Sequence, residues 1–284
     1  MEQNNIYAKV VEANIALHSK MSEYYNTCEP HFRPENVAKV EANFLKAIEG
    51  MNAEKMLDLG CGTGFMINIG KKYMKEIWGV DVTKAMTDRI DKTGSAEIIV
   101  INEDTAQAPL PVNYFDIATA YSFLHHLYEI TPTLHNAYNS LKEGGKLYAD
   151  LDPNYYFWEG VNQLDRNGHY DFIVKREIEA VTYKDEDIEK NFGVSKEIFN
   201  HAEFGKNIQG GFREEDLIDT LKSVGFTKVE LFYHWFIGQG TLINDQNYSK
   251  EERFKYAEVM NDVLQKALPL SKNLFKYIGF IATK

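Results

Sequence analysis

Short apolar runs alternate along this chain with longer stretches whose apolar residues recur at helical spacing. The runs hold about four to eight residues, which is the usual length of a buried strand and too short for a packed helix. They predict a sheet of seven strands. The predicted strands are residues 55–59, 76–80, 98–101, 115–120, 146–151, 228–235 and 277–282.

The predicted helices lie before, between and after these strands. Pro34 opens one helix and Gly50 closes it, while Ser249 and Glu252 form a capping-box pattern that starts another. Strands that alternate with helices of this length predict a parallel sheet with helices on both faces. The predicted helices are residues 6–21, 34–50, 65–74, 83–91, 133–141 and 214–224, and one from Ser249 towards Pro269.

Three glycines at alternate positions, Gly60, Gly62 and Gly64, follow the first predicted strand. A glycine accepts positive φ without strain and lets a ligand approach the backbone closely. The N–H groups of such a turn and of the next helix then face a polar ligand. The second predicted strand ends in Asp81, 21 residues after Gly60, where the carboxylate of a βαβ nucleotide site meets the ribose hydroxyls. The pattern predicts a nucleoside site.

The glycine spacing distinguishes this turn from a dinucleotide site, because the third glycine of G-x-G-x-x-G would come one place after Gly64. Residues 57–64 resemble instead the first motif of the class I S-adenosylmethionine-dependent methyltransferases. The subgroup that methylates small molecules and quinones is the most similar. Further matching segments follow in the family's order and spacing at residues 79–81, 102–106, 114–116, 123–126 and 141–145.

The resemblance implies a Rossmann-like methyltransferase fold, which is α/β and doubly wound, with a mostly parallel seven-stranded sheet that ends in an antiparallel pair. We expect a single domain over residues 1–284. Its four parts are an N-terminal helical segment (1–50), a cofactor-binding core (51–152), a cap insertion over the active site (153–212) and the C-terminal part of the sheet (213–284). An insertion after the carboxyl end of a strand is expected on the ligand-binding edge of the sheet. The pattern leaves the secondary structure of the cap open.

The resemblance also implies S-adenosylmethionine as the cofactor and gives the first motif a role in holding its methionine part. Gly60, Cys61 and Gly62 would lie along that part, and Asp58 would hold its amino group, directly or through water. The residues nearest the sulfonium would be Tyr121 and Ser122, just after the fourth predicted strand.

The adenosine part of the cofactor would meet the ends of the second and third predicted strands. Asp81 would accept hydrogen bonds from the ribose hydroxyls, and Val82 would pack near the adenine. Asp104 would accept the adenine amino group, with the backbone of Thr105 beside it. The alternative for either aspartate is a capping carboxylate at a strand-to-helix junction, and ligand contact is favoured.

His126 and Tyr25 are the candidates for catalysis. His126 follows the fourth predicted strand, and an imidazole with an unperturbed pKa of about 6.5 suits proton removal near neutrality. The alternative, that His126 bonds a strand-end carbonyl and only supports the scaffold, is favoured. Tyr25 belongs to the polar, aromatic break after the first predicted helix, where it would either line the pocket or pack at a helix junction.

Aromatic and polar residues gather in the segments that we expect at the acceptor mouth. They are consistent with an aromatic pocket for an organic acceptor or an alkylammonium group. The alternative is an aromatic core beneath the cap, which we expect for most of them. The candidates are Tyr24, Asp152, Tyr155, Tyr156, Trp158 and His234.

Composition narrows the class of partner. A net charge of −11 argues against a nucleic-acid backbone as the main partner. No apolar run approaches the roughly 20 residues that cross a bilayer, and the N-terminus lacks the pattern of a secretory signal. Cys28 and Cys61 cannot build a disulfide framework and lack metal-site spacing. We expect a cytoplasmic protein without membrane insertion or a metal site, and the oligomeric state stays open.

These features predict an enzyme that transfers a methyl group from S-adenosylmethionine to a small organic acceptor by in-line displacement. One alternative is a methyltransferase for a macromolecule, such as a tRNA or a protein side chain. Another is a non-catalytic protein that binds S-adenosylmethionine. A NAD-linked oxidoreductase is disfavoured by the glycine spacing. Whether the acceptor atom is oxygen, nitrogen, carbon or sulfur stays open.

Overall fold

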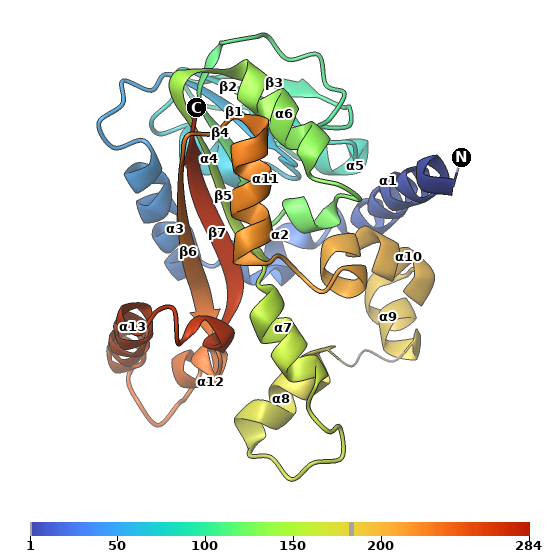
Figure 1. Cartoon of the computed structure of the whole chain (residues 1–284), viewed down its shortest axis with the longest axis vertical. Coiled ribbons are helices and arrows are strands. Elements are labelled where there is room, and N and C mark those ends of the chain that lie inside the picture. Colours follow the sequence, from blue (N-terminus) through green and yellow to red (C-terminus); the bar gives the residue numbers. More distant parts are fainter. Residues whose placement is uncertain (1, 182–184) are drawn as a thin grey trace.

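The computed structural model describes residues 2–181 and 185–284 and is built around one seven-stranded sheet. The strand order is β3-β2-β1-β4-β5-β7-β6 (Figure 1). The first five strands pair in parallel, and β7 runs antiparallel to both of its neighbours. The predicted α/β, doubly wound, mostly parallel sheet is confirmed. The strands are β1 (Lys55–Leu59), β2 (Glu76–Val80), β3 (Glu97–Ile101), β4 (Phe115–Tyr121), β5 (Leu141–Pro153), β6 (Lys228–Phe236) and β7 (Phe275–Thr283).

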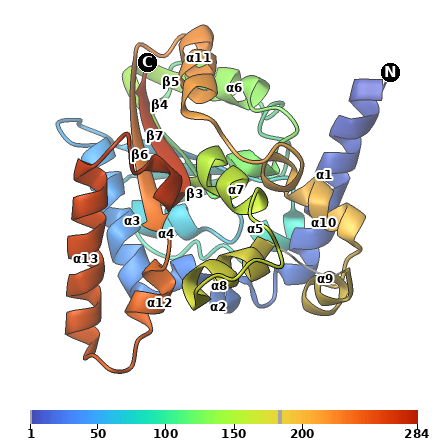
Figure 2. The ribbon, with the colours of Figure 1, turned by 60° about the horizontal axis from the view of Figure 1, so that its bottom comes forward.

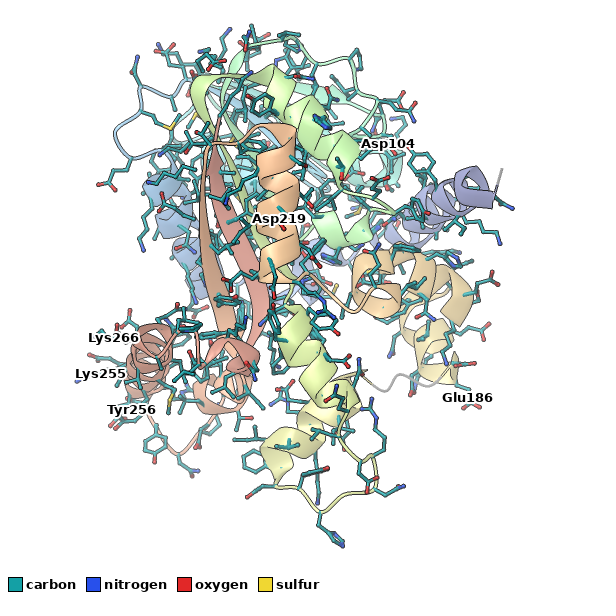
Figure 3. All side chains as sticks on the ribbon, viewed as in Figure 1. Asp104, Glu186, Asp219, Lys255, Tyr256 and Lys266 are labelled. Atoms are coloured by element: carbon teal, nitrogen blue, oxygen red, sulfur yellow. The ribbon has the colours of Figure 1, made fainter. Side chains whose placement is uncertain are left out.

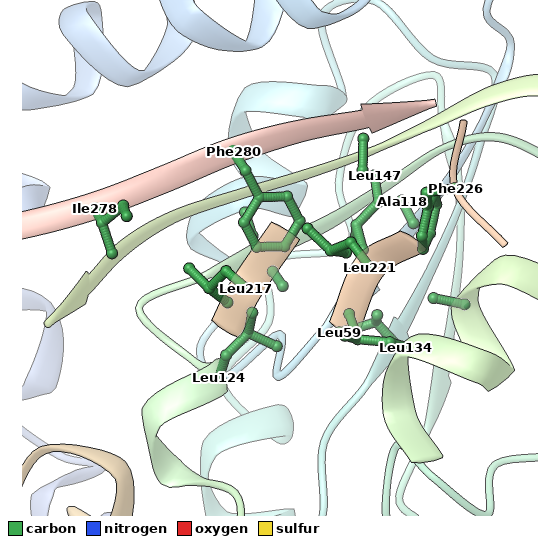
Figure 4. Packing of buried hydrophobic residues seen from close by; sticks show 14 of the residues in the cluster. Leu59, Ala118, Leu124, Leu134, Leu147, Leu217, Leu221, Phe226, Ile278 and Phe280 are labelled. Carbon is green, nitrogen blue, oxygen red and sulfur yellow. The ribbon is translucent and has the colours of Figure 1, made fainter. Parts of the chain in front are cut away.

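Helices cover both faces of the sheet, because each central strand is apolar on both sides. On one face α6 (Thr131–Ser140) and α11 (Glu214–Val224) pack through residues such as Leu134 and Leu221 (Figure 4). On the other face α3 (Pro34–Ala47) and α4 (Phe65–Gly70) pack on Met56 and its neighbours. Successive strand residues point to opposite faces, so Met56 joins the second cluster while Leu57 joins the first.

The remaining helices of the predicted pattern are present with shifted ends. The first, α1 (Glu2–Met21), has its predicted C-terminus, whereas α5 (Lys84–Thr87) is much shorter than predicted. Ser249 and Glu252 form the capping box of α13 (Lys250–Lys266). The predicted end at Gly50 is wrong, because α3 stops at Ala47. Two short helices, α2 (Tyr25–Cys28) and α12 (Gln239–Ile243), were not predicted.

Residues 153–212 are helical where the structure describes them, and they divide into two packing groups; residues 182–184 lie outside the described part. The first group, α7 (Tyr155–Asn162) and α8 (Phe172–Val181), has its own small core below the sheet. The second group, α9 (Asp185–Phe192) and α10 (Lys196–Ala202), packs against α1 (Figure 2). A π-helical turn, η3 (Phe204–Ile208), leads back to the sheet.

Candidate functional site

A cavity of about 430 Å³ lies at the carboxyl ends of the central strands, where the strand order reverses between β1 and β4. Open α/β sheets bind their ligands at this point. The volume lies within the usual range for a small-molecule site. Nine of the ten residues expected to contact a cofactor line the cavity. These nine are Gly60, Cys61, Gly62, Asp81, Val82, Asp104, Thr105, Tyr121 and Ser122.

The glycine turn forms the floor of the cavity in a conformation that only glycine adopts easily. Gly60 and Gly62 have φ of +66° and +50°. A Cβ at Gly60 would lie 2.0 Å from Cδ2 of Phe123, so the ring of Phe123 packs directly on the bare backbone. The turn is tied to the neighbouring strand, because the Gly60 N–H donates to the Val80 carbonyl at 2.8 Å. The turn therefore has a fixed shape.

Asp81 joins the glycine turn to the loop after β2. Its Oδ2 accepts a hydrogen bond from the Gly62 N–H at 2.9 Å, and its Oδ1 accepts one from the Thr83 N–H at 2.7 Å. Burial raises the pKa of this carboxyl, although the two hydrogen bonds oppose the shift. A carboxylate has about four acceptor positions, so Asp81 can cap the loop and still accept ligand hydroxyls.

Asp104 lies at the far wall of the cavity, next to α1 (Figure 3). Its Oδ2 accepts a hydrogen bond from the Tyr7 hydroxyl at 2.7 Å, and its Oδ1 accepts one from the Ala106 N–H at 2.8 Å. Burial, followed by the hydrogen bond to Asp104, raises the pKa of Tyr7 to about 12. The sequence did not predict this link between the first helix and the segment 102–106.

Asp58 is buried in β1 and is the one expected cofactor residue outside the cavity lining. Its Oδ1 accepts a hydrogen bond from the Thr119 hydroxyl at 2.7 Å, but its Oδ2 has no partner among the described residues. Burial raises the pKa of Asp58 to about 7. A buried carboxylate oxygen without a donor indicates a missing partner. A ligand amino group could donate the missing hydrogen bond to Oδ2, directly or through water. The residues present therefore fit the expected cofactor.

The cover of the cavity is α1, and the expectation of a cap at 153–212 over the mouth needs correction. Val10, Val11, Asn14 and His18 of α1 line the cavity, whereas no described residue of 153–212 does. Asn14 Nδ2 donates to the His126 carbonyl at 2.9 Å and fixes the helix over the turn after β4. Residues 153–212 contribute indirectly instead. Their helices α9 and α10 pack on the apolar stripe of α1 and bury it.

Aromatic rings close one end of the cavity. The ring centroids of His31 and Phe65 are 4.8 Å apart, and those of Phe65 and Tyr121 are also 4.8 Å apart. The ring centroids of Tyr25 and His31 are 6.0 Å apart. Tyr25 lines the cavity, which was one of the two positions expected for it. Burial lowers the pKa of His31 to about 4, so its ring is neutral at pH 7. Ser122 beside them has φ of +51°, a strained conformation of the kind that occurs at functional sites.

His18 and His126 line the cavity, His125 lies behind them, and each of the three has one ring nitrogen bound to the protein. His18 Nδ1–H donates to the Asn14 carbonyl at 3.0 Å, and His126 Nδ1–H donates to the Ala202 carbonyl at 2.7 Å. His125, behind them, donates from Nδ1–H to Asp152 at 2.8 Å. Burial lowers the pKa of each of these three rings to about 4. All three are therefore neutral imidazoles at pH 7.

The residues expected at the acceptor mouth do not line the cavity. Tyr24 is exposed at the start of α2. Asp152 is buried and accepts hydrogen bonds from the backbone N–H and the ring of His125. His234 lies near Asp150 and Lys39 at a separate small cavity of about 10 Å³.

The aromatic run after β5 is also away from the cavity. Trp158 is buried and donates from Nε1 to the Lys276 carbonyl at 3.1 Å. Tyr155 stacks with the guanidinium of Arg213, and Tyr156 bonds Glu215. These rings pack beside the start of β7, where α7 follows the end of β5. The alternative weighed from the sequence, an aromatic core, describes them better than an acceptor pocket.

Sequence reasoning missed the cavity residues of α1, although a signal was present. Tyr7, Val11, Asn14 and His18 recur at intervals of four, three and four residues, which places them on one helix face. This face lies beside the apolar stripe that packs on α10. Polar side chains next to a buried stripe are the expected pattern for a helix that covers a ligand.

Comparisons with known proteins agree with this geometry. Residues 57–149 match a family described as "Methyltransferase domain". The uncharacterized methyltransferase YcgJ of Bacillus subtilis is 29% identical over 43% of this chain and 51% of its own length, so the chain aligns with only about half of this relative. The ubiquinone biosynthesis O-methyltransferase of Pseudomonas aeruginosa is 22% identical over 58% of this chain and 77% of its own length.

Solved structures share the fold. A SAM-dependent methyltransferase from Archaeoglobus fulgidus matches with a TM-score of 0.51 and 19% identity, over 87% of this chain and 94% of that one. A structure from Thermotoga maritima, described as a possible histamine N-methyltransferase, matches with a TM-score of 0.53 and 16% identity, over 94% and 99%.

The fold and the glycine turn define a Rossmann-like α/β domain with a nucleoside site at its topological switch point. The family match then identifies the class. Residues 57–149 carry a methyltransferase domain, and the chain shares the fold of solved S-adenosylmethionine-dependent methyltransferases. In addition, no helix in the described ranges is both long and apolar enough to pass through a bilayer.

Proposed function

We propose that this protein transfers a methyl group from S-adenosylmethionine to a small organic acceptor enclosed beneath α1. The observation that carries the proposal is the single cavity in which Gly60, Asp81 and Asp104 meet the inner face of α1. A macromolecular acceptor is less consistent with a cavity whose cover is tied down through Tyr7 and Asn14.

The proposed cofactor contacts follow the polar groups of the cavity. Asp81 accepts the ribose hydroxyls, and Asp104 accepts the adenine amino group beside the Thr105 backbone. Val82 packs near the adenine. Asp58 Oδ2 takes the amino group of the methionine part, directly or through water. The proposal is supported by the free acceptor positions of these carboxylates and by the unpaired Oδ2 of Asp58.

The acceptor is proposed to lie against the aromatic wall formed by Tyr25, His31, Phe65 and Tyr121. No lysine or arginine of the described chain lines the cavity, and burial lowers the pKa of His31 to about 4. A buried anionic group on the acceptor would therefore have no cationic partner, and burying an unpaired charge is costly. We propose an acceptor that is uncharged or cationic where it is enclosed. This excludes phosphorylated and carboxylated acceptors from the buried part of the site.

The bound cofactor supplies an electrophilic methyl group on a sulfonium. The chain orients the acceptor against it with aromatic walls and excludes water with α1, which are the main requirements of an in-line displacement. His18 has a lone pair on Nε2, because its Nδ1–H is donated to Asn14. It can accept a hydrogen bond from the acceptor and receive the proton that leaves as the new bond forms.

We place the reaction in the cytoplasm, because the exposed Cys28 and the buried Cys61 are both free thiols. Turnover tests the proposal. The full chain is incubated with S-adenosylmethionine labelled in its methyl group and with fractionated metabolites or cell RNA and protein. Label in the small, uncharged or basic fraction supports it. Label confined to acidic metabolites, RNA or protein would contradict it.

A further inference from the structure

A buried cluster of metal-ligating side chains lies beside the cavity and is not used by the methyl transfer. One ring nitrogen of His125, one of His126 and one carboxylate oxygen of Glu203 lie within 4.8 Å of one another. Their side chains are 7%, 12% and 15% exposed. The two histidines come from the turn η2 (Leu124–His126) after β4, and Glu203 lies between α10 and η3.

The carboxylate of Glu203 faces these rings at distances that leave it without a hydrogen bond. Its Oε2 is 3.9 Å from His125 Nε2, and its Oε1 is 3.8 Å from His126 Nδ1. Both distances exceed the range of a hydrogen bond. Within the described residues, Glu203 accepts no hydrogen bond from any donor, and its one close cation is Lys206, at 3.7 Å. Glu203 Oε2 and the lone pair on His125 Nε2 face each other as two acceptors with no donor between them in the described chain, which indicates a bridging group.

The surrounding structure holds the two rings as it would for metal ligands. His125 donates from Nδ1–H to the Asp152 carboxylate, and His126 donates from Nδ1–H to the Ala202 carbonyl. Each bond orients its ring and leaves Nε2 with the lone pair, the arrangement found at metal-binding histidines. His126 would therefore bind an ion through Nε2, because its Nδ1, 3.8 Å from Glu203, already donates to Ala202. Gly205 lets η3 approach this turn, because a Cβ there would lie 2.8 Å from the Cα of His125. The close approach is therefore built into the backbone.

We propose that His125, His126 and Glu203 bind a divalent transition-metal ion, Zn²⁺ in the first place. Two imidazoles and one carboxylate are a typical ligand set for Zn²⁺ with a fourth position left for water. Ligand atoms on one such ion lie roughly 3–4 Å apart, so the widest pair needs to close by about 1 Å. His126 borders the cavity, which gives an ion a path to the site. This assigns His126 to the metal, a role different from both alternatives weighed from the sequence, proton transfer and support of the scaffold.

The ion would tie η2 to the end of α10, and α10 packs on α1. It would thereby stabilise α1, the cover of the cavity, through the contact between α1 and α10. Lys206 competes with the ion for Glu203, so its charge weakens binding and its removal strengthens it. This gives the site a signature that a merely structural ion-pair network would not have.

The test uses the full chain after a chelator has been removed by dialysis. Co²⁺ is titrated with visible absorption as the readout, and Zn²⁺ with calorimetry. We expect one equivalent of ion with the absorption bands of four- or five-coordinate Co²⁺. Glu203→Gln lowers the affinity at least tenfold, whereas the exposed control His135→Gln leaves it unchanged. Lys206→Met raises the affinity, a gain that misfolding cannot produce.

The proposal is overturned if the wild type binds no stoichiometric ion, or if Glu203→Gln and wild type bind it equally well. Equal losses in Glu203→Gln and His135→Gln would show adventitious surface binding and overturn it too. If Glu203→Gln does not fold by circular dichroism, Lys206→Met decides, and an unchanged or lowered affinity rejects the site. Calorimetry of S-adenosylhomocysteine with metal-free protein tests the proposed function separately.

Discussion

The hydroxyl of Tyr7 donates a hydrogen bond of 2.7 Å to the carboxylate of Asp104. This bond joins the first helix of the chain to the loop after β3, across the cavity that the two elements enclose. The proposed adenine acceptor is thus also an anchor of the cover. Cofactor exchange in this protein is therefore expected to require movement of α1.

Removal of this bond tests the anchoring role of α1. Tyr7→Phe deletes two partly exposed hydrogen bonds, the one donated to Asp104 and the one that the hydroxyl accepts from Gln107 Nε2 at 3.0 Å, so we expect a loss of about 1 kcal/mol in the free energy of unfolding. The same energy corresponds to about a fivefold faster release of S-adenosylhomocysteine, measured by stopped flow. Tyr24→Phe is the matched control, because Tyr24 is exposed. Equal release rates in the two variants would contradict the anchoring role.

The glycine turn gives a steric prediction with an internal control. Gly60 and Gly50 both have positive φ, but only a Cβ at Gly60 meets another group, the ring of Phe123 at 2.0 Å. Gly50→Ala is expected to cost about 1–2 kcal/mol from its backbone conformation alone. Gly60→Ala should cost roughly 2 kcal/mol more because of overpacking, as measured by urea unfolding.

A double variant separates the two causes at Gly60. In a Phe123→Ala background the extra cost of Gly60→Ala should fall, because the Cβ then has space. If the cost of Gly60→Ala is the same in both backgrounds, the ring of Phe123 is not what requires a glycine there.

The raised pKa of Asp58 predicts a pH dependence of cofactor affinity. Burial raises this pKa to about 7, so the carboxyl of the ligand-free protein is protonated below that pH. The proposed amino-group contact needs the carboxylate, so the affinity for S-adenosylhomocysteine should rise as pH increases through about 7. The free energy of unfolding should fall as pH rises from about 4 to about 7, because over that range the folded state retains a proton that the unfolded state has lost. In Asp58→Asn both profiles should lose this component. A wild-type affinity that is flat in pH would contradict the assigned contact.

The buried His31 predicts the opposite dependence for stability. Its pKa is lowered by burial to about 4, below the ordinary value of 6.5. As pH falls from 6.5 towards 4, His31 becomes protonated in the unfolded chain but stays neutral in the folded chain. The free energy of unfolding therefore falls by up to about 3 kcal/mol. His31→Gln should remove this loss in urea unfolding at several pH values, whereas the exposed His135→Gln should retain it.

Much of the fold and half of the site could be predicted because they depend on local pattern. Gly60, Asp81 and Asp104 each follow a short buried strand, and parallel strands bring their carboxyl ends to one edge. The short apolar runs and the residues that follow them therefore predict the nucleoside end of the site, and no knowledge of long-range packing is needed.

The particular residues of the cover and of the acceptor end depend on contacts between distant segments, so the sequence pattern did not reveal them. The place of α1 is set by α9 and α10, far along the chain, which bury its apolar stripe. Trp158 and Tyr155 are aromatic residues of the kind that lines an acceptor pocket, yet they pack on Lys276 of β7 and on Arg213, away from the cavity. Aromatic content marks burial, and only tertiary contacts decide between a core and a pocket.

Calorimetric titration of S-adenosylhomocysteine tests the central claim most directly, because it needs no acceptor. The wild type should bind one equivalent, and Asp81→Asn should weaken binding by about tenfold to a hundredfold through the loss of a charged hydrogen-bond acceptor for the ribose. Asp88→Asn, at an exposed aspartate of the neighbouring helix end, should bind like the wild type. A wild type that binds nothing, or an Asp81→Asn variant that binds as tightly as the wild type, would contradict the site described above.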